Sequence, residues 1–343
     1  MIIIKDILNY CKKNNCSDIH ISSFSQITLR LDGSIVNLPG LHNPTSEEVY
    51  SCLRSITSEK QMKNYLDNQE IDFAIQIEDD LRFRVNAFHT IKGPAIVFRQ
   101  ITTKIKTLDE LNLPKIVGSF ANFQNGLVLI SGPTGHGKST TISALIDLIN
   151  QSKSKHIITI EDPVEFIHFN KKSIINQREV GSNTKSFPGA LKSSLREDPD
   201  IILVGEMRDL ETIQLALTAA ETGHLVFATL HTNSTVHAIS RILDVFPSDS
   251  KPSVRSMLSS SLKAILSQHL LPGINGGRYP ACEVMITNNS TRNLIRENNL
   301  HQINSIIEMN KKNGMITIRD SVNEMYEKGL ISKDTFEDAL LYC

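Results

Sequence analysis

Cysteine is scarce in this sequence, and its spacing excludes two kinds of cross-link. The five cysteines are odd in number and none belongs to a Cys-x-x-Cys pair; they are Cys11, Cys16, Cys52, Cys282 and Cys343. A disulfide framework uses an even set of cysteines, and zinc sites draw on closely spaced pairs. Neither is indicated here, and a reducing cytoplasm is the favoured compartment.

Net charge is nearly absent, and so are long apolar runs. The 343 residues include 36 basic and 37 acidic side chains, for a formal net charge of -1. Without an excess of positive charge, nucleic acid is not favoured as a partner. The run Met1 to Ile4 is too short for the core of a signal peptide, and no later run approaches the ~18 apolar residues of a membrane span. We therefore expect a soluble protein that meets membranes only peripherally, through its partners.

Residues 1–100 predict an α+β domain. Helical spacing of apolar residues covers 2–11 and again 46–68, where Ser46 is a plausible N-cap. Alternating stretches predict strands, which are separated by turn residues such as Asp32-Gly33, Asp79-Asp80 and Gly93-Pro94. The predicted strands are 19–22, 27–31, a third after the Asp32-Gly33 turn, and then 71–78, 81–89 and 95–100. Residues 101–114 have weak periodicity and end in Leu113-Pro114, so we interpret them as a linker.

Residues 115–343 predict a second domain with a parallel sheet covered by helices. Apolar runs alternate with helical patterns, which is typical of such a sheet. The runs are 127–130, 156–160, 201–204 and 225–230, and the helices between them include 140–150, 189–196 and 210–222. From Lys251 onward the pattern is mainly helical and ends with a helix at 333–341.

Gly126 to Asn150 reads as a buried strand, a glycine-rich turn and a helix. The turn matches G-x-x-x-x-G-K-[ST], which allows backbone N–H groups to converge on phosphate oxygens at the positive end of a helix dipole. Lys138 is expected at the β- and γ-phosphates, and the Ser139 hydroxyl at Mg²⁺. The expected nucleotide-binding residues here are Gly132, Pro133, Thr134, Gly135, His136, Gly137, Lys138, Ser139 and Thr140.

Polar residues follow the other three apolar runs. These are Glu161-Asp162, then Gly205-Glu206, then His231. Ligands of α/β sheets gather at the carboxyl ends of the strands, so these groups should meet at one rim and serve phosphoryl transfer to water. Glu161 and Glu206 are the candidate metal carboxylates. Because Gly205 stands where a Walker B aspartate is usual, Glu206 is expected to hold the metal through water or to orient the attacking water.

Each of these residues also has a structural interpretation. Glu161 could cap a strand end, and Glu206 could be a surface residue. His224 and His231, which flank the last run, could be structural histidines.

Arginines gather on one predicted strand face. Arg82 and Arg84 are two apart, so they point to one face while Phe83 and Val85 point to the other. With Arg99 they could reach the nucleotide of a neighbouring subunit and stabilise charge in the transition state. The alternative is a solvated basic face.

Together these motifs resemble the secretion ATPases of type IV pilus and type II secretion systems. Four signatures occur in family order: Walker A at 132–139, an Asp box at 159–165, Walker B at 201–209 and a His box at 222–232. Flanking segments at 82–86, 176–180 and 195–200 match as well. The compact chain and the segment Arg292 to Glu297 resemble the retraction branch, although Ser290-Thr291 replace its Ala-Ile.

The resemblance implies a PAS-like N-terminal domain and a RecA-like P-loop ATPase domain with a parallel-rich sheet and a helical C-terminal part. It implies a homohexamer with ATP and Mg²⁺ at the subunit junctions, on the cytoplasmic face of the inner membrane, acting on a pilus platform protein there.

By the same resemblance, individual residues take on roles. Glu206 is the catalytic carboxylate, Glu161 assists at the metal or water, and His231 senses the γ-phosphate. Arg82, Arg84 and Arg99 act across subunits, and His224 joins the nucleotide site. His136 stands where serine is common, and we expect little effect on binding because backbone amides suffice there.

Three other functions remain open at this stage. They are a motor for pilus extension or for type II or type IVB secretion, a nucleotide-binding assembly regulator without turnover, and a nucleic-acid translocase.

Overall fold

The computed structural model describes residues 4–14, 16–31, 34–78, 81–101 and 104–341. The expected turns at Asp32-Gly33 and Asp79-Asp80 lie outside these residues, as do Met1 to Ile3 and Cys343. The chain divides into two compact units, Met1–Lys104 and Ile105–Cys343. In the part of the chain that is described, no helix combines the length and the apolar character that a bilayer span needs.

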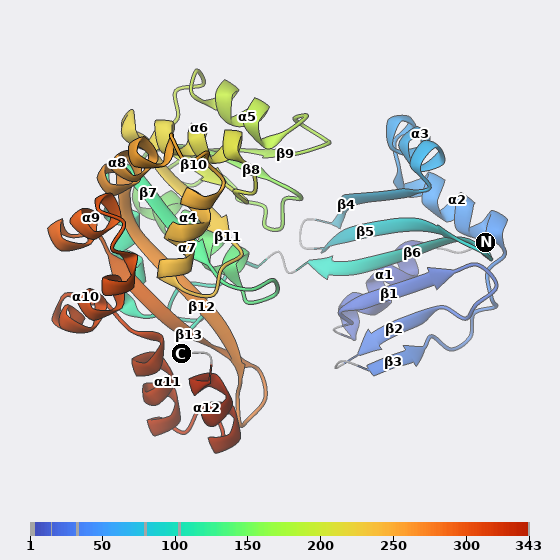
Figure 1. Ribbon diagram of the computed structural model, residues 1–343. Helices are drawn as coiled ribbons and strands as arrows, with labels where there is room; N and C mark the ends of the chain where they lie inside the picture. The colour runs from blue at the N-terminus through green and yellow to red at the C-terminus, as the bar shows by residue number, and fades with distance from the viewer. Residues whose placement is uncertain (1–3, 15, 32–33, 79–80, 102–103, 342–343) are drawn as a thin grey trace. The chain divides into compact units, whose positions relative to one another are not determined.

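The first unit is a six-stranded antiparallel sheet with three helices (Figure 1). The strand order is β3-β2-β1-β6-β5-β4. The strands are β1 (Asp18–Ser22), β2 (Thr28–Leu31), β3 (Ser34–Asn37), β4 (Glu70–Glu78), β5 (Leu81–Thr90) and β6 (Gly93–Ile101), and the helices are α1 (Ile4–Lys13), α2 (Ser46–Ile56) and α3 (Glu59–Asn68). Leu8, Leu53 and Phe98 are fully buried in the core that the helices share with one sheet face.

The single helix expected at 46–68 is two helices. Thr57 is extended (φ -116°, ψ 148°), and Ser58 begins α3 with a capping box to Gln61. The first helix is capped by Thr45 and not by Ser46, through a capping box to Glu48. Apolar spacing continued across the break, whereas the capping boxes satisfy the free N–H groups of two separate helix starts.

The second unit is built on a seven-stranded sheet of order β13-β12-β7-β11-β10-β8-β9. All neighbouring strands are parallel except β12 and β13. The strands are β7 (Gly126–Ser131), β8 (His156–Glu161), β9 (Ile174–Glu179), β10 (Ile201–Val204), β11 (Leu225–Leu230), β12 (Leu262–Pro272) and β13 (Arg278–Ile286). The four apolar runs of the sequence are therefore the adjacent strands β7, β11, β10 and β8.

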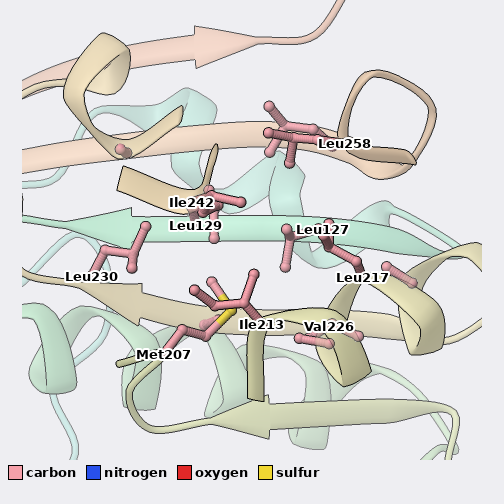
Figure 2. Packing of buried hydrophobic residues seen from close by; sticks show 14 of the residues in the cluster. Leu127, Leu129, Met207, Ile213, Leu217, Val226, Leu230, Ile242 and Leu258 are labelled. Carbon is pink, nitrogen blue, oxygen red and sulfur yellow. The ribbon is translucent and has the colours of Figure 1, made fainter. Parts of the chain in front are cut away.

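Helices cover both faces of this sheet. Figure 2 shows one face, where Leu127 and Leu129 of β7 pack against Ile213, Ile242 and Leu258. The helices and short 3₁₀ turns of the unit are η1 (Lys115–Asn122), α4 (Lys138–Ser152), α5 (Phe187–Ser194), α6 (Leu210–Glu221), α7 (Thr235–Asp244), α8 (Lys251–Ser261), α9 (Asn289–Arg296), η2 (Leu300–Gln302), α10 (Ile303–Met309), η3 (Lys311–Asn313), α11 (Ile318–Glu327) and α12 (Lys333–Leu340). On the opposite face, α4 and η1 share a core with Val128 and Ile130.

The expectation of a mainly helical segment from Lys251 is wrong for residues 262–286. Helix α8 ends at Ser261, and β12 and β13 then form an antiparallel hairpin. Leu262, Ile265 and Leu266 follow helical spacing as well as they fit a strand. Because β12 lies between β7 and β13 and is buried on both faces, it shows no alternation that would have revealed it.

The segment expected to be a linker, 101–114, is divided between the units. Ile101 ends β6 in the first unit. Leu113 is buried in the second, in the core that contains Val117 and Phe120.

Candidate active site

The glycine-rich turn joins β7 to α4 at the carboxyl end of the sheet. Gly132, Gly135 and Gly137 all have positive φ. Gly137 is the N-cap of α4 in a left-handed conformation, and Lys138 is the first helical residue. The turn therefore presents backbone amides at the start of a fifteen-residue helix, as binding of an anion requires.

Lys138 is buried and has only uncharged hydrogen-bond partners in the described structure. Its Nζ donates to the carbonyls of Gly132 at 2.8 Å and Pro133 at 3.0 Å. Burial lowers the pKa of Lys138, against the opposing charges of Glu206 and Glu165. A desolvated ammonium held by carbonyl dipoles at a helix N-terminus favours an anionic ligand, and the triphosphate of ATP fits this donor set.

His231 links the turn to Glu206. It follows β11, and its Nε2 lies 3.1 Å from Glu206 Oε1. Its Nδ1 lies 3.2 Å from Thr134 Oγ1 and 3.3 Å from Lys138 Nζ. Lysine can only donate, so Nδ1 is the acceptor and the proton is on Nε2, facing the carboxylate. The ring is thus a neutral bridge in this arrangement.

Glu206 follows β10 and has a second partner besides His231. Arg208 Nε lies 2.6 Å from Glu206 Oε1. Burial alone would raise the pKa of Glu206, but the hydrogen bonds from Arg208 and His231 and the charge of Arg208 outweigh it and hold that pKa below its ordinary value. Glu206 is therefore an ionised acceptor over the neutral pH range.

Glu161 ends β8 in a different environment. It accepts hydrogen bonds from Thr159 Oγ1 at 2.6 Å and from Gln177 Nε2 at 3.3 Å. Burial raises the pKa of Glu161 to about 7, although both hydrogen bonds oppose the shift. A carboxyl group that titrates near neutrality can exchange a proton at little cost, which suits assistance at a metal or a water.

Gly205 explains the missing Walker B aspartate. A Cβ at this position would lie 3.0 Å from the carbonyl oxygen of Ile160 and 3.2 Å from Cα of Glu161. The end of β10 is pressed against the end of β8, with Val204 paired to Ile160. A side chain at position 205 would press on Ile160 and Glu161, and the first carboxylate after β10 is that of Glu206.

The side chains suit Mg²⁺ held mainly by a nucleotide. No cluster of three or more His, Cys, Asp or Glu close enough to hold a metal occurs within the described ranges. Mg²⁺ commonly keeps several waters and is bound through phosphates and one or two side chains. Ser139 on the first turn of α4, with Glu206 or Glu161 acting through water, fits such a shell.

Some predicted residues lie elsewhere. His224 precedes β11 and contacts the Ala219 carbonyl at 3.0 Å. The six residues of β11 span roughly 20 Å, so His224 is at the far end from His231 and does not join this cluster.

Arg82, Arg84 and Arg99 belong to the first unit. There Arg84 donates to Asp72 at 3.1 Å, and Arg99 donates to Asp18 at 2.8 Å.

Several residues at the site were not among those predicted from the sequence. Arg208 lies inside the Walker B segment, where its proximity to Glu206 was a usable signal. Gln177 belongs to β9, an edge strand that polar residues concealed. Gln268 and Arg278 come from β12 and β13, which were taken for helix. They contact the glycine-rich turn from more than 130 residues away in the chain.

A cavity of about 440 Å³ adjoins the start of α4. It is lined by Gly137, Thr140, Leu270 and Tyr279, among others. It thus continues from the phosphate-binding turn along β12 and β13.

Comparisons with known proteins show which family this chain matches and which relatives it has. The family described as Type II/IV secretion system protein matches residues 1–299. The chain is 47% identical over 333 residues to the type IV pilus retraction ATPase PilT of Pseudomonas aeruginosa, covering 96% of both. It is 50% identical over 315 residues to a twitching motility protein of Neisseria gonorrhoeae, covering 91% of this chain and 83% of that one.

A solved structure agrees over nearly the whole chain. The pilus retraction motor PilT with bound ADP matches with a TM-score of 0.93 at 44% identity, covering 99% of this chain and 97% of that one. This similarity confirms the expected α/β fold class and its two-part architecture.

Proposed function

Because this chain belongs to the type II/IV secretion system protein family, we propose that it is an ATPase that powers retraction of a type IV pilus. The similarity to retraction and twitching motility proteins over more than nine-tenths of the chain supports retraction in particular. The cofactors we propose are ATP and Mg²⁺, and a related motor is known with ADP bound.

One observation carries the proposal of ATP hydrolysis. Lys138, His231 and Glu206 form a continuous line of contacts across the ends of three adjacent strands, with His231 3.3 Å from Lys138 and 3.1 Å from Glu206. This line joins the phosphate-binding group to the ionised carboxylate. A γ-phosphate that binds beside Lys138 would contact His231. Because His231 also contacts Glu206, the position of the Glu206 carboxylate would change.

The residues take the following roles in this proposal. The turn and Lys138 bind phosphates, and Ser139 contributes to the Mg²⁺ shell. Glu206 orients the attacking water and accepts its proton, while Glu161 assists at the metal or water. The bound metal would supply neutralisation of charge on the phosphates. The cavity next to Gly137 and Thr140 is proposed to receive the nucleoside.

The assembly we propose is a homohexamer at the cytoplasmic face of the inner membrane. Arg82, Arg84 and Arg99 would then act on the nucleotide of a neighbouring subunit, and the ring would drive a membrane-embedded pilus platform protein. Closure of two domains around a nucleotide is a general way of converting ligand chemistry into movement.

Phosphate release from the purified protein, measured together with ATP binding, tests the proposal. Lys138→Ala is expected to abolish binding, whereas Glu206→Ala should bind ATP and lose turnover by about 10²–10⁴-fold. Lys155→Ala is a matched control, because Lys155 precedes β8 and pairs with Asp200 at 2.6 Å, away from the rim. Hydrolysis by Glu206→Ala at the wild-type rate would show the catalytic assignment to be wrong.

Deletion of the gene distinguishes retraction from extension. Cells without a retraction motor should carry excess pili that do not retract. Cells without pili would instead indicate an extension motor. A purified protein that binds ATP without releasing phosphate would point to the assembly regulator.

A further inference from the structure

We propose that Gln268, on β12, is a positioning residue that holds the phosphate-binding turn in its binding shape. Its side chain is almost completely buried. Its Nε2 donates to the carbonyl of His136 at 2.6 Å, and its Oε1 accepts from Thr141 Oγ1 at 2.8 Å. One amide thus connects the turn to the first part of α4. The inference rests on the proposed binding of ATP at this turn.

The bond to His136 acts on the part of the turn that must face phosphate. In a trans peptide, the C=O and the following N–H point in opposite directions. Fixing the His136 carbonyl toward Gln268 therefore directs the N–H of Gly137 away from Gln268. Preorganised amides avoid the cost of ordering the loop when the anion binds.

The turn is also pressed against Gln268 at both ends. A Cβ at Gly132 would lie 2.3 Å from the backbone oxygen of Gln268, and a Cβ at Gly137 would lie 2.9 Å from its Nε2. Both glycines have positive φ. The spacing of the two glycines in the motif thus matches a physical contact with one residue of β12.

No other side chain of similar size could replace this amide. Gln268 must donate to a carbonyl and accept from a hydroxyl at the same time. Leucine would remove the partner of the partly buried His136 carbonyl and of the buried Thr141 hydroxyl. Glutamate would keep the Thr141 bond but set a carboxylate oxygen against the His136 carbonyl.

The same hairpin supports the turn at two further points. The N–H of Leu270 donates to His136 Nδ1 at 3.0 Å, and Arg278 Nη1 donates to the Gly135 carbonyl at 3.1 Å. The His136 side chain therefore also contacts the hairpin, while the small effect of this residue on binding stays a prediction. Gln268 remains the central contact because it is buried and joins two elements.

Binding of Mg-ATP and steady-state hydrolysis by the full chain test this inference. Gln268→Leu and Gln268→Glu should weaken ATP affinity by about ten- to a hundredfold, with a matching rise in KM. Turnover at saturating ATP should stay within about threefold, because the hydrolytic residues are untouched. Ser267→Ala is the matched control, since the neighbouring Ser267 hydroxyl is buried without a hydrogen-bond partner in the described structure.

A second pair of variants keeps the test valid if Gln268 variants do not fold. Thr141→Val removes only the bond to Gln268 and should weaken ATP binding by about three- to tenfold, while Thr141→Ser should restore it. Wild-type affinity in folded Gln268→Leu, or in Thr141→Val, would overturn the inference, as would a loss confined to turnover. Failure of the wild-type protein to bind Mg-ATP would instead refute the proposed function.

Discussion

Cationic side chains have different partners on the basic face of the first unit and at the strand-end rim of the second. On the basic face, Arg84 and Arg99 lie opposite each other on β5 and β6. Each is paired with an aspartate of its own sheet. At the rim, Lys138 contacts carbonyls and a neutral imidazole. The first arrangement neutralises its charges locally, whereas the second leaves a positive charge for a ligand.

The two carboxyl groups Asp18 and Glu161 make the same contrast. For Asp18, burial alone would raise the pKa, but hydrogen bonds from Arg99 and Ser17 and the charge of Arg99 hold it below the ordinary value. For Glu161, burial dominates and raises the pKa to about 7. The difference lies in the neighbours: an arginine beside Asp18, and only neutral donors beside Glu161.

Arg84→Ala and Asp72→Ala break the same ion pair and so separate two roles for the basic face. If Arg84 acts on a neighbouring subunit's nucleotide, Arg84→Ala should lower turnover of the assembled protein by about 10³–10⁵-fold, and Asp72→Ala should not. Both variants should lose less than about 1 kcal/mol of stability, since the pair is partly exposed. Equal turnover in the two variants would confine Arg84 to its pair with Asp72. Phosphate release from the assembled protein measures the difference.

Gly205→Ala tests the close packing of β10 against β8 at the rim. The added methyl group would press on Ile160 and Glu161, so we expect a loss of about 1–3 kcal/mol in stability and roughly tenfold in turnover. Thermal unfolding and phosphate release measure these effects. Gly118→Ala is the control, because a Cβ there would meet its nearest neighbour at an ordinary 3.7 Å. Similar losses in both variants would contradict a special contact at Gly205.

Asp18→Asn tests whether the basic face is stabilised by its pairing. The variant should lose about 1–3 kcal/mol of unfolding free energy at pH 7, because a buried charged acceptor is replaced. The folded pKa of Asp18 is lowered, so its contribution is present above the ordinary value of 3.8 and is lost as the pH falls. The difference between variant and wild type should thus shrink in acid. A difference that does not change with pH would argue against the ion pair.

Glu161→Gln should change stability with the opposite sign. The folded pKa of Glu161 is raised from 4.5 to about 7, so wild-type stability decreases as the pH rises through that interval. Glutamine has no such loss, and without nucleotide the variant should be more stable than wild type by up to about 3 kcal/mol above neutrality. Below pH 5 the two should unfold alike. Thermal unfolding from pH 5 to 8 measures this, and equal stability at pH 8 would contradict the raised pKa.

Local patterns predicted much of this molecule because they act over a few residues. The strand, turn and helix around Lys138 follow from glycine spacing and apolar periodicity, and the four adjacent strands β7, β11, β10 and β8 follow from their continuous apolar runs. Helix α9 has an amphipathic pattern, and Ile295 is fully buried there. Thr291, which departs from the family motif, forms a capping box with Asn288 and so begins the helix.

Other features could not be predicted because they depend on contacts between distant segments. The break at Thr57 arises from competing caps, and β12 was hidden by burial on both faces. The hydrogen bond from Gln268 to His136 joins residues 132 positions apart. No local pattern marks such a contact.

The sequence by itself determined which chemical groups this protein has and at which ends of its strands they stand, because motif spacing and strand periodicity are properties of short segments. Only the tertiary structure decided how those groups are tuned. His231 lies between Lys138 and Glu206, and the β12–β13 hairpin contacts the phosphate-binding turn. Asp18 has an arginine partner, whereas Glu161 has only neutral hydrogen-bond donors. These outcomes depend on which strands become neighbours, and that is settled by packing of the whole core.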